Sequence, residues 1–373
     1  MNSRERLLAA WSFEEPDRVP IEIQIMGGAR QFPEAERILR FIDEEADNFL
    51  GAPAADWGFL GLPTEYSEEI IEDVPGDYRR MRRSHRTDVG EFYAITRHKY
   101  EELDASDFHW ERRFIHTLEE MERVADAPRP IPTLAVDKFE ARVAAIGDRG
   151  VPLVGLLHPL GHLVRQATIE HVYGWLAGEP QVIHRFLENA NRQVTETVEQ
   201  MAEVGIGPYY TVTAHEMLIP PWMSPGMFDE FVFEYDKQVN DTIHRCGGRL
   251  RAHCHDKVSN FLEQMSEMGF DALEPLEPPP FGDVDLGDAK RRVGDRMLLS
   301  GNVPSQDFLN MTCEEVRQYV RRTIEVGAPG GGFPLRTTGG GAGTGAVKSR
   351  EQMLGLFERI EAYIEAGLEF GSY

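Results

Sequence analysis

Strand-like and helix-like segments alternate along the second half of the chain, and this alternation limits the fold more than any other feature. Each strand-like segment is short, and apolar residues at helical spacing follow it. The six predicted strands cover residues 151–157, 206–214, 249–255, 270–276, 296–303 and 330–338. Such a regular strand–helix alternation indicates a parallel sheet wrapped by helices.

A barrel explains this alternation better than an open sheet does. No Gly-rich dinucleotide-binding fingerprint follows any of the strands, as it would in a doubly wound sheet. Residues 18–25 (RVPIEIQI) form a further predicted strand at the start of the chain. We therefore predict an α/β fold, a (β/α)8 TIM barrel with N-terminal additions, as a single domain over residues 1–373.

A β-hairpin excursion from the barrel is predicted at residues 65–100, where polar and apolar residues alternate. This segment is rich in arginine, and two roles are open for these side chains. They form a substrate-facing cluster, or they balance the nearby acids, which is the commoner arrangement. The glycine-rich stretch 339–345 lacks the Lys-Ser/Thr ending of a P-loop, so we expect a flexible loop over the site.

Charge and cysteine content exclude several classes of protein. The chain carries a formal net charge of −24, whereas nucleic-acid binding requires Lys and Arg against phosphates, so no nucleic-acid partner is expected. The same charge disfavours a highly anionic substrate. Three cysteines, an odd number without a C-x-x-C pair, predict a cytoplasmic protein, and the first residues do not resemble a signal peptide. We expect no membrane span, because no run of 18 apolar residues occurs.

The C-terminal ends of the predicted strands carry a concentration of His, Glu and Asn. In a (β/α)8 barrel, catalytic side chains lie at these ends of the strands. A set of such residues at one end is stronger evidence than any single member, since Asn302 could cap a helix and Glu277 could shape a loop. The catalytic candidates are His253, His255, Glu216 and Asn302, and the substrate-binding candidates are His158, His215, Glu274, Glu277, Arg336 and Thr338.

The strand with the sequence RLRAHCHD holds the densest group of candidates. Because successive side chains of a strand point to opposite faces, His253 and His255 share one face and Cys254 takes the other. Two adjacent imidazoles with the carboxylate of Glu216 or Glu274 would form an open three-ligand zinc site. Without a metal, the two imidazoles would serve as hydrogen-bond donors or as a general acid.

Several motifs, in this order and over nearly the whole chain, resemble the uroporphyrinogen decarboxylase-like superfamily. They are NSRERLLAA at 2–10, EPDRVP at 15–20, PWMSP at 221–225, HCHDKV at 253–258, LEP at 276–278, LSGNV at 299–303 and GGGF at 330–333. The resemblance implies a (β/α)8 barrel. It also implies one of two activities, because the superfamily contains both decarboxylases and cobamide-dependent methyltransferases.

The resemblance to the decarboxylase branch is incomplete. Uroporphyrinogen decarboxylases hold a porphyrinogen with eight carboxylates through an N-terminal Arg-Gln-Ala-Gly-Arg motif. The corresponding residues 26–34 read MGGARQFPE, which keeps at most one of the two arginines. A chain with a net charge of −24 and without these arginines is a poor host for that substrate.

The methyltransferase branch moves a methyl group between a corrinoid protein and a thiol or tetrahydrofolate. Its thiol-using members hold zinc with His-x-Cys on a strand and a later Cys. Here His253 matches the His, His255 takes the Cys position, and residues 333–345 contain no Cys. Either the metal is held differently, with Glu216 as a candidate ligand, or the acceptor needs no zinc.

The resemblance therefore implies a methyltransferase with a corrinoid (cobalamin-type) methyl carrier and, in one form, zinc. The implied partners are a corrinoid protein, docking on the glycine-rich loop 339–345, and a small-molecule methyl acceptor. A homodimer is compatible with such a chain. The alternatives are a lyase that decarboxylates uroporphyrinogen or a smaller acid, a metal-dependent hydrolase suggested by His-x-His, and a non-catalytic small-molecule binder.

Overall fold

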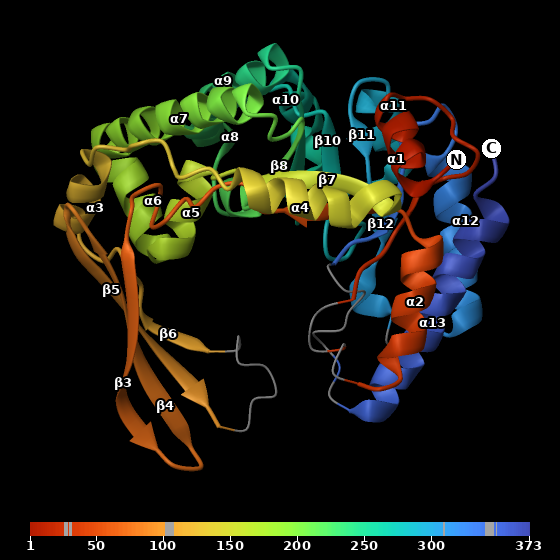
Figure 1. Cartoon of the computed structure of the whole chain (residues 1–373), viewed down its shortest axis with the longest axis horizontal. Helices are drawn as coiled ribbons and strands as arrows, with labels where there is room; N and C mark the ends of the chain where they lie inside the picture. Colours follow the sequence, from red (N-terminus) through yellow and green to blue (C-terminus); the bar gives the residue numbers. More distant parts are fainter. Residues whose placement is uncertain (26–28, 30–31, 101–107, 309, 340–346, 348) are drawn as a thin grey trace.

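A strongly curved parallel sheet and a separate antiparallel sheet form the β-structure of this α/β protein (Figure 1). The structure is a computed structural model, and it describes residues 1–25, 29, 32–100, 108–308, 310–339, 347 and 349–373. In Figure 1 the antiparallel sheet projects at the lower left, and helices α2, α12 and α13 lie on the right.

The parallel strands are arranged in two hydrogen-bonded sections, with the orders β11-β10-β9-β8-β7-β2 and β1-β13-β12. Each of the six strands predicted in the second half overlaps an observed strand, and the observed strands are shorter. The strand β7 begins one residue earlier than predicted, at Gly150, and the predicted strand 296–303 covers two observed strands, β11 and β12. The strand β2 was not predicted from the sequence. The strands are β1 (Ile21–Glu22), β2 (Asn48–Ala52), β7 (Gly150–Gly155), β8 (Tyr209–Val212), β9 (Arg249–Cys254), β10 (Ala272–Pro275), β11 (Leu298–Leu299), β12 (Gly301–Val303) and β13 (Leu335–Thr337).

The two sections approach each other at both of their edges. On one side only Ser300 separates β11 from β12 along the chain. On the other side the Asp47 N–H donates to the Ile21 carbonyl at 2.7 Å, and the Ile23 N–H donates to Asn48 Oδ1 at 3.0 Å. These contacts place β1 beside β2, at the end of the long section.

Helices surround the parallel sheet and bury their apolar faces against it, in a core that extends through most of the chain. Thr312 and Glu315 form a capping box at the start of one of these helices, because each side chain accepts from the other residue's backbone N–H. The helices are α1 (Ser3–Trp11), α2 (Ala35–Glu45), α3 (Leu118–Ala125), α4 (Val136–Ile146), α5 (Pro159–Gln166), α6 (Ile169–Gly178), α7 (Pro180–Glu203), α8 (Pro225–Phe228), α9 (Glu234–Arg245), α10 (Leu262–Glu267), α11 (Leu286–Val293), α12 (Cys313–Gly327) and α13 (Arg350–Phe370).

The antiparallel sheet is formed by β3 (Glu65–Val74), β4 (Tyr78–Thr87), β5 (Gly90–Lys99) and β6 (His109–Arg112), in that order. Three of these strands cover the segment in which the sequence predicts a hairpin. Several of their arginines pair with acids on other strands of the same sheet, at 2.7 Å to 3.7 Å. The pairs are Arg79–Asp73, Arg80–Glu72, Arg80–Glu111, Arg82–Glu91 and Arg83–Glu68. Of the two roles left open, the structure shows the balancing of nearby acids for these four arginines.

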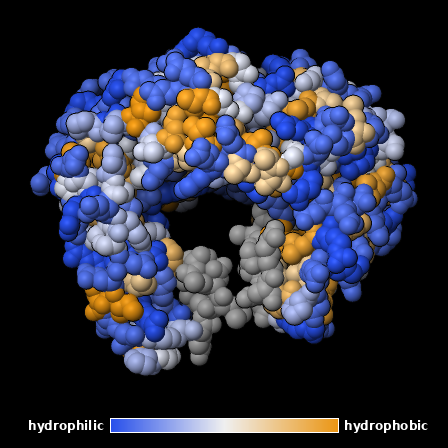
Figure 2. All heavy atoms as spheres, viewed as in Figure 1, coloured by the Kyte–Doolittle hydropathy of each residue, from blue (hydrophilic) through white to orange (hydrophobic). Residues whose placement is uncertain are grey.

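Figure 2 shows a hollow in the middle of this face of the molecule, between the antiparallel sheet and the side formed by α2 and α13. Of the helices in the described ranges, none combines the length and the apolarity that crossing a membrane requires.

Candidate active site

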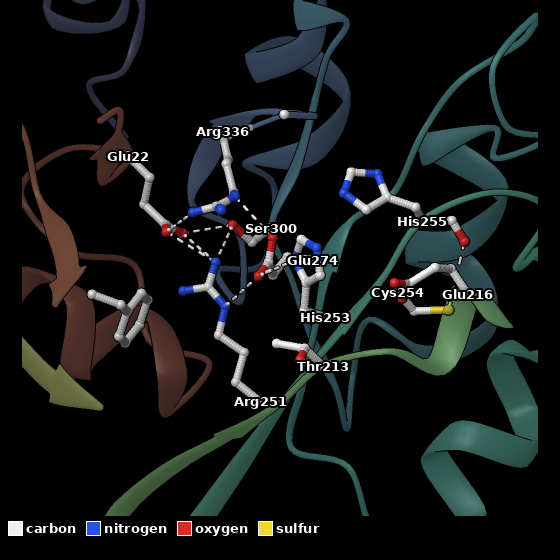
Figure 3. Close-up of polar contacts among 12 residues, drawn as sticks. Glu22, Thr213, Glu216, Arg251, His253, Cys254, His255, Glu274, Ser300 and Arg336 are labelled. Atoms are coloured by element: carbon white, nitrogen blue, oxygen red, sulfur yellow. Dashed lines mark hydrogen bonds and ion pairs between the residues drawn. The ribbon is translucent and has the colours of Figure 1, made fainter. Parts of the chain in front are cut away.

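The C-terminal ends of the parallel strands bring charged side chains together, and we call this end of the sheet the mouth (Figure 3). Strand register decides which of them are neighbours. Glu274 of β10 lies opposite His253 of β9. On the other section, Arg336 of β13 lies opposite Glu22 of β1 and Asn302 of β12.

Beneath the mouth, two glutamates and two arginines form a buried charge network. Arg251 Nη2 lies 2.9 Å from Glu22 Oε2, and Arg336 Nη1 lies 2.9 Å from the same oxygen. The Ser300 hydroxyl donates to Glu22 Oε1 at 2.6 Å. Arg336 Nε lies 2.9 Å from Glu274 Oε2 as an ion pair. The charges balance, which is necessary because burying an unpaired ion costs several kcal/mol.

His253 is oriented by this network. Its Nδ1 lies 2.8 Å from Glu274 Oε1. Burial opposes ionisation of Glu274, but the charges of Arg336 and Arg251 and the His253 hydrogen bond outweigh it and hold the pKa of that carboxyl well below its ordinary value. An ionised Glu274 accepts a hydrogen bond, so His253 carries its proton on Nδ1 and leaves Nε2 unprotonated in the neutral form.

His255 has an equivalent carboxylate partner. Its Nδ1 lies 3.1 Å from Glu277 Oε1, and its ring centroid lies 4.6 Å from that of His253. Burial opposes protonation, yet the hydrogen bond and charge of Glu277, with the charge of Glu216, raise the pKa of His255 above its ordinary value. Both imidazole side chains are partly exposed, whereas Cys254 is fully buried on the opposite face of the strand.

Further hydrogen bonds extend from Glu277 across the mouth. Gln306 Nε2 donates to Glu277 Oε1 at 3.0 Å, and the Thr338 hydroxyl donates to Gln306 Oε1 at 3.2 Å. Burial opposes ionisation of Glu277, but the hydrogen bonds from His255 and from the Asp256 N–H hold its pKa below the ordinary value. Thr338 is thus a buried member of this chain of hydrogen bonds, and its role in substrate binding stays a prediction.

The structure brings the three predicted metal ligands, His253, His255 and Glu216, to the same end of the sheet, but not to ligand spacing. His253 and His255 each present an Nε2 atom, and Glu216 Oε2 is buried without a hydrogen-bond partner in the described part of the chain. These features fit metal ligation. Among the described residues, however, these three side chains do not bring their ligand atoms within 4.8 Å of one another.

Among the described residues, His158, His215 and Asp236 do bring their potential ligand atoms within 4.8 Å of one another. Both histidines were predicted to bind substrate at the mouth, but both are buried behind the sheet against α9. His158 Nε2 lies 3.0 Å from Asp236 Oδ1, and His215 Nε2 lies 2.7 Å from Asp236 Oδ2. The substrate-binding prediction for these two residues is therefore corrected to a buried His–Asp–His contact.

Tautomer geometry indicates that this contact is a hydrogen-bonded unit. The Gly161 N–H donates to His158 Nδ1 at 2.9 Å, as the N-cap of α5, so the His158 proton resides on Nε2. Burial opposes ionisation of Asp236, but the two imidazoles hold its pKa far below the ordinary value. Burial lowers the pKa of His215. A carboxylate held by two neutral imidazole N–H groups needs no metal ion.

Several residues of the site were missed from the sequence. Arg251 has a sequence signal, because it precedes His253 by two positions and so shares its face of the strand. Glu22 is an acid within an apolar strand segment, which is a weaker signal. Asp236 has none, because its partners lie on distant elements. The residues 26–28, 30–31 and 340–345, on which other predictions depended, lie outside the described residues.

Three comparisons relate the chain to known proteins. The family described as "Uroporphyrinogen decarboxylase (URO-D)" matches residues 114–338. The chain is 30% identical over 221 residues to the uroporphyrinogen decarboxylase of Thioalkalivibrio sulfidiphilus, covering 57% of each chain. It is 25% identical over 250 residues to that of Cupriavidus pinatubonensis, covering 65% of each. The matches thus span little more than half the length of these curated relatives.

A solved structure is similar over a greater length. The methyltransferase from Methanosarcina mazei superposes with a TM-score of 0.59 at 15% identity, covering 99% of each chain. At this identity the likeness concerns the fold.

Proposed function

Because the chain belongs to the uroporphyrinogen decarboxylase family, we propose that it is a methyltransferase of that family, acting between a corrinoid carried by a partner protein and a small thiol or tetrahydrofolate. One observation carries the proposal: His253 and His255 lie side by side, each bound at Nδ1 by a carboxylate. Carboxylate–histidine pairs are the arrangement that orients metal-ligating imidazoles.

We propose also that the parallel strands belong to one (β/α)8 barrel. The adjacency of β11 and β12 along the chain and the hydrogen bonds between residues 21–23 and 47–48 support this. Counting β11 and β12 as one strand gives a ring of eight. Its mouth would then be the surface on which a corrinoid protein docks.

Zinc would be held by Nε2 of His253 and of His255, with Glu216 as a third ligand. When bound, it would lower the pKa of an acceptor thiol and keep the sulfur as a thiolate. Glu274 and Glu277 orient the two rings through Nδ1. Glu216 has to move toward the rings, and its Oε2 gives up no hydrogen bond within the described part of the chain when it does so.

The reaction itself demands alignment and proton control from the chain. The acceptor sulfur forms a bond to the methyl carbon as the carbon–cobalt bond breaks, and the electron pair of that bond remains with cobalt. The acceptor proton must leave before this step. In the form without zinc, His255 Nε2 is suited to take it, because Glu277 and Glu216 favour the protonated form of that ring. With zinc bound at Nε2, the proton would leave to solvent.

The charges at the mouth favour this activity over porphyrinogen decarboxylation. Acids predominate there, with Glu216, Asp256 and Glu277 beside His255. Four arginines of the antiparallel sheet, Arg79, Arg80, Arg82 and Arg83, are paired with nearby acids. An eight-carboxylate substrate would therefore meet repulsion at the mouth. Decarboxylation of a smaller acid is the second candidate, favoured by the names of the curated relatives.

The test is to mix the protein with methylcob(III)alamin and either a thiol or tetrahydrofolate, and to follow the corrin spectrum. We expect demethylation that is faster than in the protein-free control and that is lost in His253→Ala. Metal analysis of the same sample measures zinc per chain. Release of CO2 from uroporphyrinogen or a smaller acid, without corrin demethylation, would overturn the proposal and favour the second candidate.

A further inference from the structure

A cavity of about 470 Å³ lies where the antiparallel sheet meets the helices around the parallel sheet. Its walls come from residues 62–63 before β3, 87–89 between β4 and β5, 127–130 after α3, and Arg192 of α7. It shares none of its lining residues with the mouth. Its volume lies within the roughly 300–1,000 Å³ that is usual for small-molecule sites.

Arg129 in the wall of this cavity is a buried cation with unused donors. Its side chain is nearly enclosed, with the residue 4% exposed. Nη1 donates to the carbonyls of Val124 and Ala127 at the end of α3, and the guanidinium carbon lies 5.0 Å from the Phe186 ring centroid. In the described part of the chain, Nε and Nη2 have no hydrogen-bond partner.

The charge of Arg129 is also uncompensated. No described carboxylate lies within ion-pair distance of it. Two other buried arginines are by contrast paired: Arg251 with Glu22 at 2.9 Å, and Arg6 with Asp47 at 2.6 Å. Burial, with a smaller effect of the Arg192 charge, lowers the pKa of Arg129 to about 10, so it remains protonated at neutral pH. In a chain with a net charge of −24, the lack of a counter-ion here is unusual.

Buried donors without acceptors are costly, at about 1–3 kcal/mol each, and in native proteins they call for an explanation such as a bound water or ion. The carbonyls at the end of α3 accept hydrogen bonds from Nη1 of Arg129 only, and they leave its other donors without an acceptor among the described residues. Arg192 adds a second positive charge at the rim, where it is half exposed and bonded to Glu196. Much of the remaining wall is apolar and includes three prolines, Pro63, Pro128 and Pro130.

We propose that this cavity binds a small organic anion, a carboxylate or phosphate attached to an apolar body. The anionic oxygens lie toward Arg129 and Arg192, and the apolar body lies on the prolines and Val89. A small adjustment of the Arg129 side chain brings its shielded Nε and Nη2 to the ligand. Asp88 is exposed at the rim and restricts the anionic group to the arginine side.

Calorimetric titration of the full chain tests the proposal with four probes: phenyl phosphate, benzoate, inorganic phosphate and neutral benzamide. We expect phenyl phosphate or benzoate to bind at least tenfold more tightly than benzamide, and the preferred one of the two identifies the anionic group. Inorganic phosphate should bind more weakly than phenyl phosphate, because it lacks the apolar body. Failure of both aromatic anions to bind, or equal binding of benzamide, would overturn the proposal.

Variants locate the binding. Arg129→Met should weaken it at least tenfold and Arg192→Gln several-fold, while Arg185→Gln, an exposed arginine paired with Asp126, is the matched control. If Arg129→Met does not fold, Arg192→Gln and the cavity-filling Val89→Trp decide the question. Binding that persists unchanged in both, or that is lost in His253→Ala at the mouth, would refute the site.

Discussion

Replacing Glu22 by Gln removes one charge from the buried network without changing the size of the side chain. Glu22 is fully buried and accepts hydrogen bonds from Arg251, Ser300 and Arg336. In Glu22→Gln two buried guanidinium groups would share the single carboxylate of Glu274. Removing one partner of a buried ion pair costs about 3–5 kcal/mol.

This loss converts into a measurable shift of the melting temperature. Unfolding entropy is about 2.1 cal/mol/K per residue, which for 373 residues is about 0.8 kcal/mol/K. We therefore expect Tm to fall by about 4–6 °C in Glu22→Gln, measured by differential scanning calorimetry at neutral pH. The matched control is Glu196→Gln, which removes an exposed helical pair with Arg192 and should cost about 0.5 kcal/mol or less.

A second variant separates the uncompensated charge from other effects of the substitution. Adding Arg251→Met to Glu22→Gln restores the balance of charge, so the double variant should be more stable than the sum of the two single changes predicts. If Tm decreases by less than about 1 °C in Glu22→Gln, or if the two single changes simply add in the double variant, charge balance does not stabilise this network.

Three further predictions concern the mouth and the buried aspartate. His253→Ala should abolish corrin demethylation, whereas Cys254→Ser should retain most of it because this thiol lies off the site; the reverse ranking would contradict the assigned strand faces. Glu277→Gln should lower the pKa of His255, measured by NMR titration, and should move the acidic limb of the pH–rate profile to lower pH. The free energy of folding that His255 gains from Glu277 is present below the ordinary His pKa, and it is lost as the pH rises through the raised pKa. Asp236→Asn should lower the free energy of unfolding by about 3 kcal/mol at pH 7, measured by thermal unfolding, because two hydrogen bonds to a carboxylate are weakened. Since folding lowers the pKa of Asp236, its contribution to stability is present above the ordinary Asp pKa and is lost in acid. Equal stability of variant and wild type at pH 7 would contradict this.

Local sequence patterns were sufficient for the strand–helix alternation and for part of the site. Strand periodicity alone places His253 and His255 on one face and Cys254 on the other, as the 4.6 Å separation of the rings and the burial of the thiol show. The cap at Thr312 depends on residues three positions apart, and it too follows from sequence. The same periodicity would also have indicated Arg251.

Residues after the end of a strand follow no such periodicity, so the sequence could not show where they point. His158 and His215 follow strand ends, yet they turn away from the mouth to Asp236, because a helix distant in sequence places a carboxylate there.

The sequence by itself determined the order of elements and the faces of the strands, since both depend on neighbouring residues. The tertiary structure alone decided which charges are compensated. Glu22 meets Arg251 and Arg336 across strands that are far apart in the chain, while Arg129 lies buried without a counter-ion in the described part of the chain. Coulomb energies depend on distance and burial, and neither quantity is contained in the local pattern of residues.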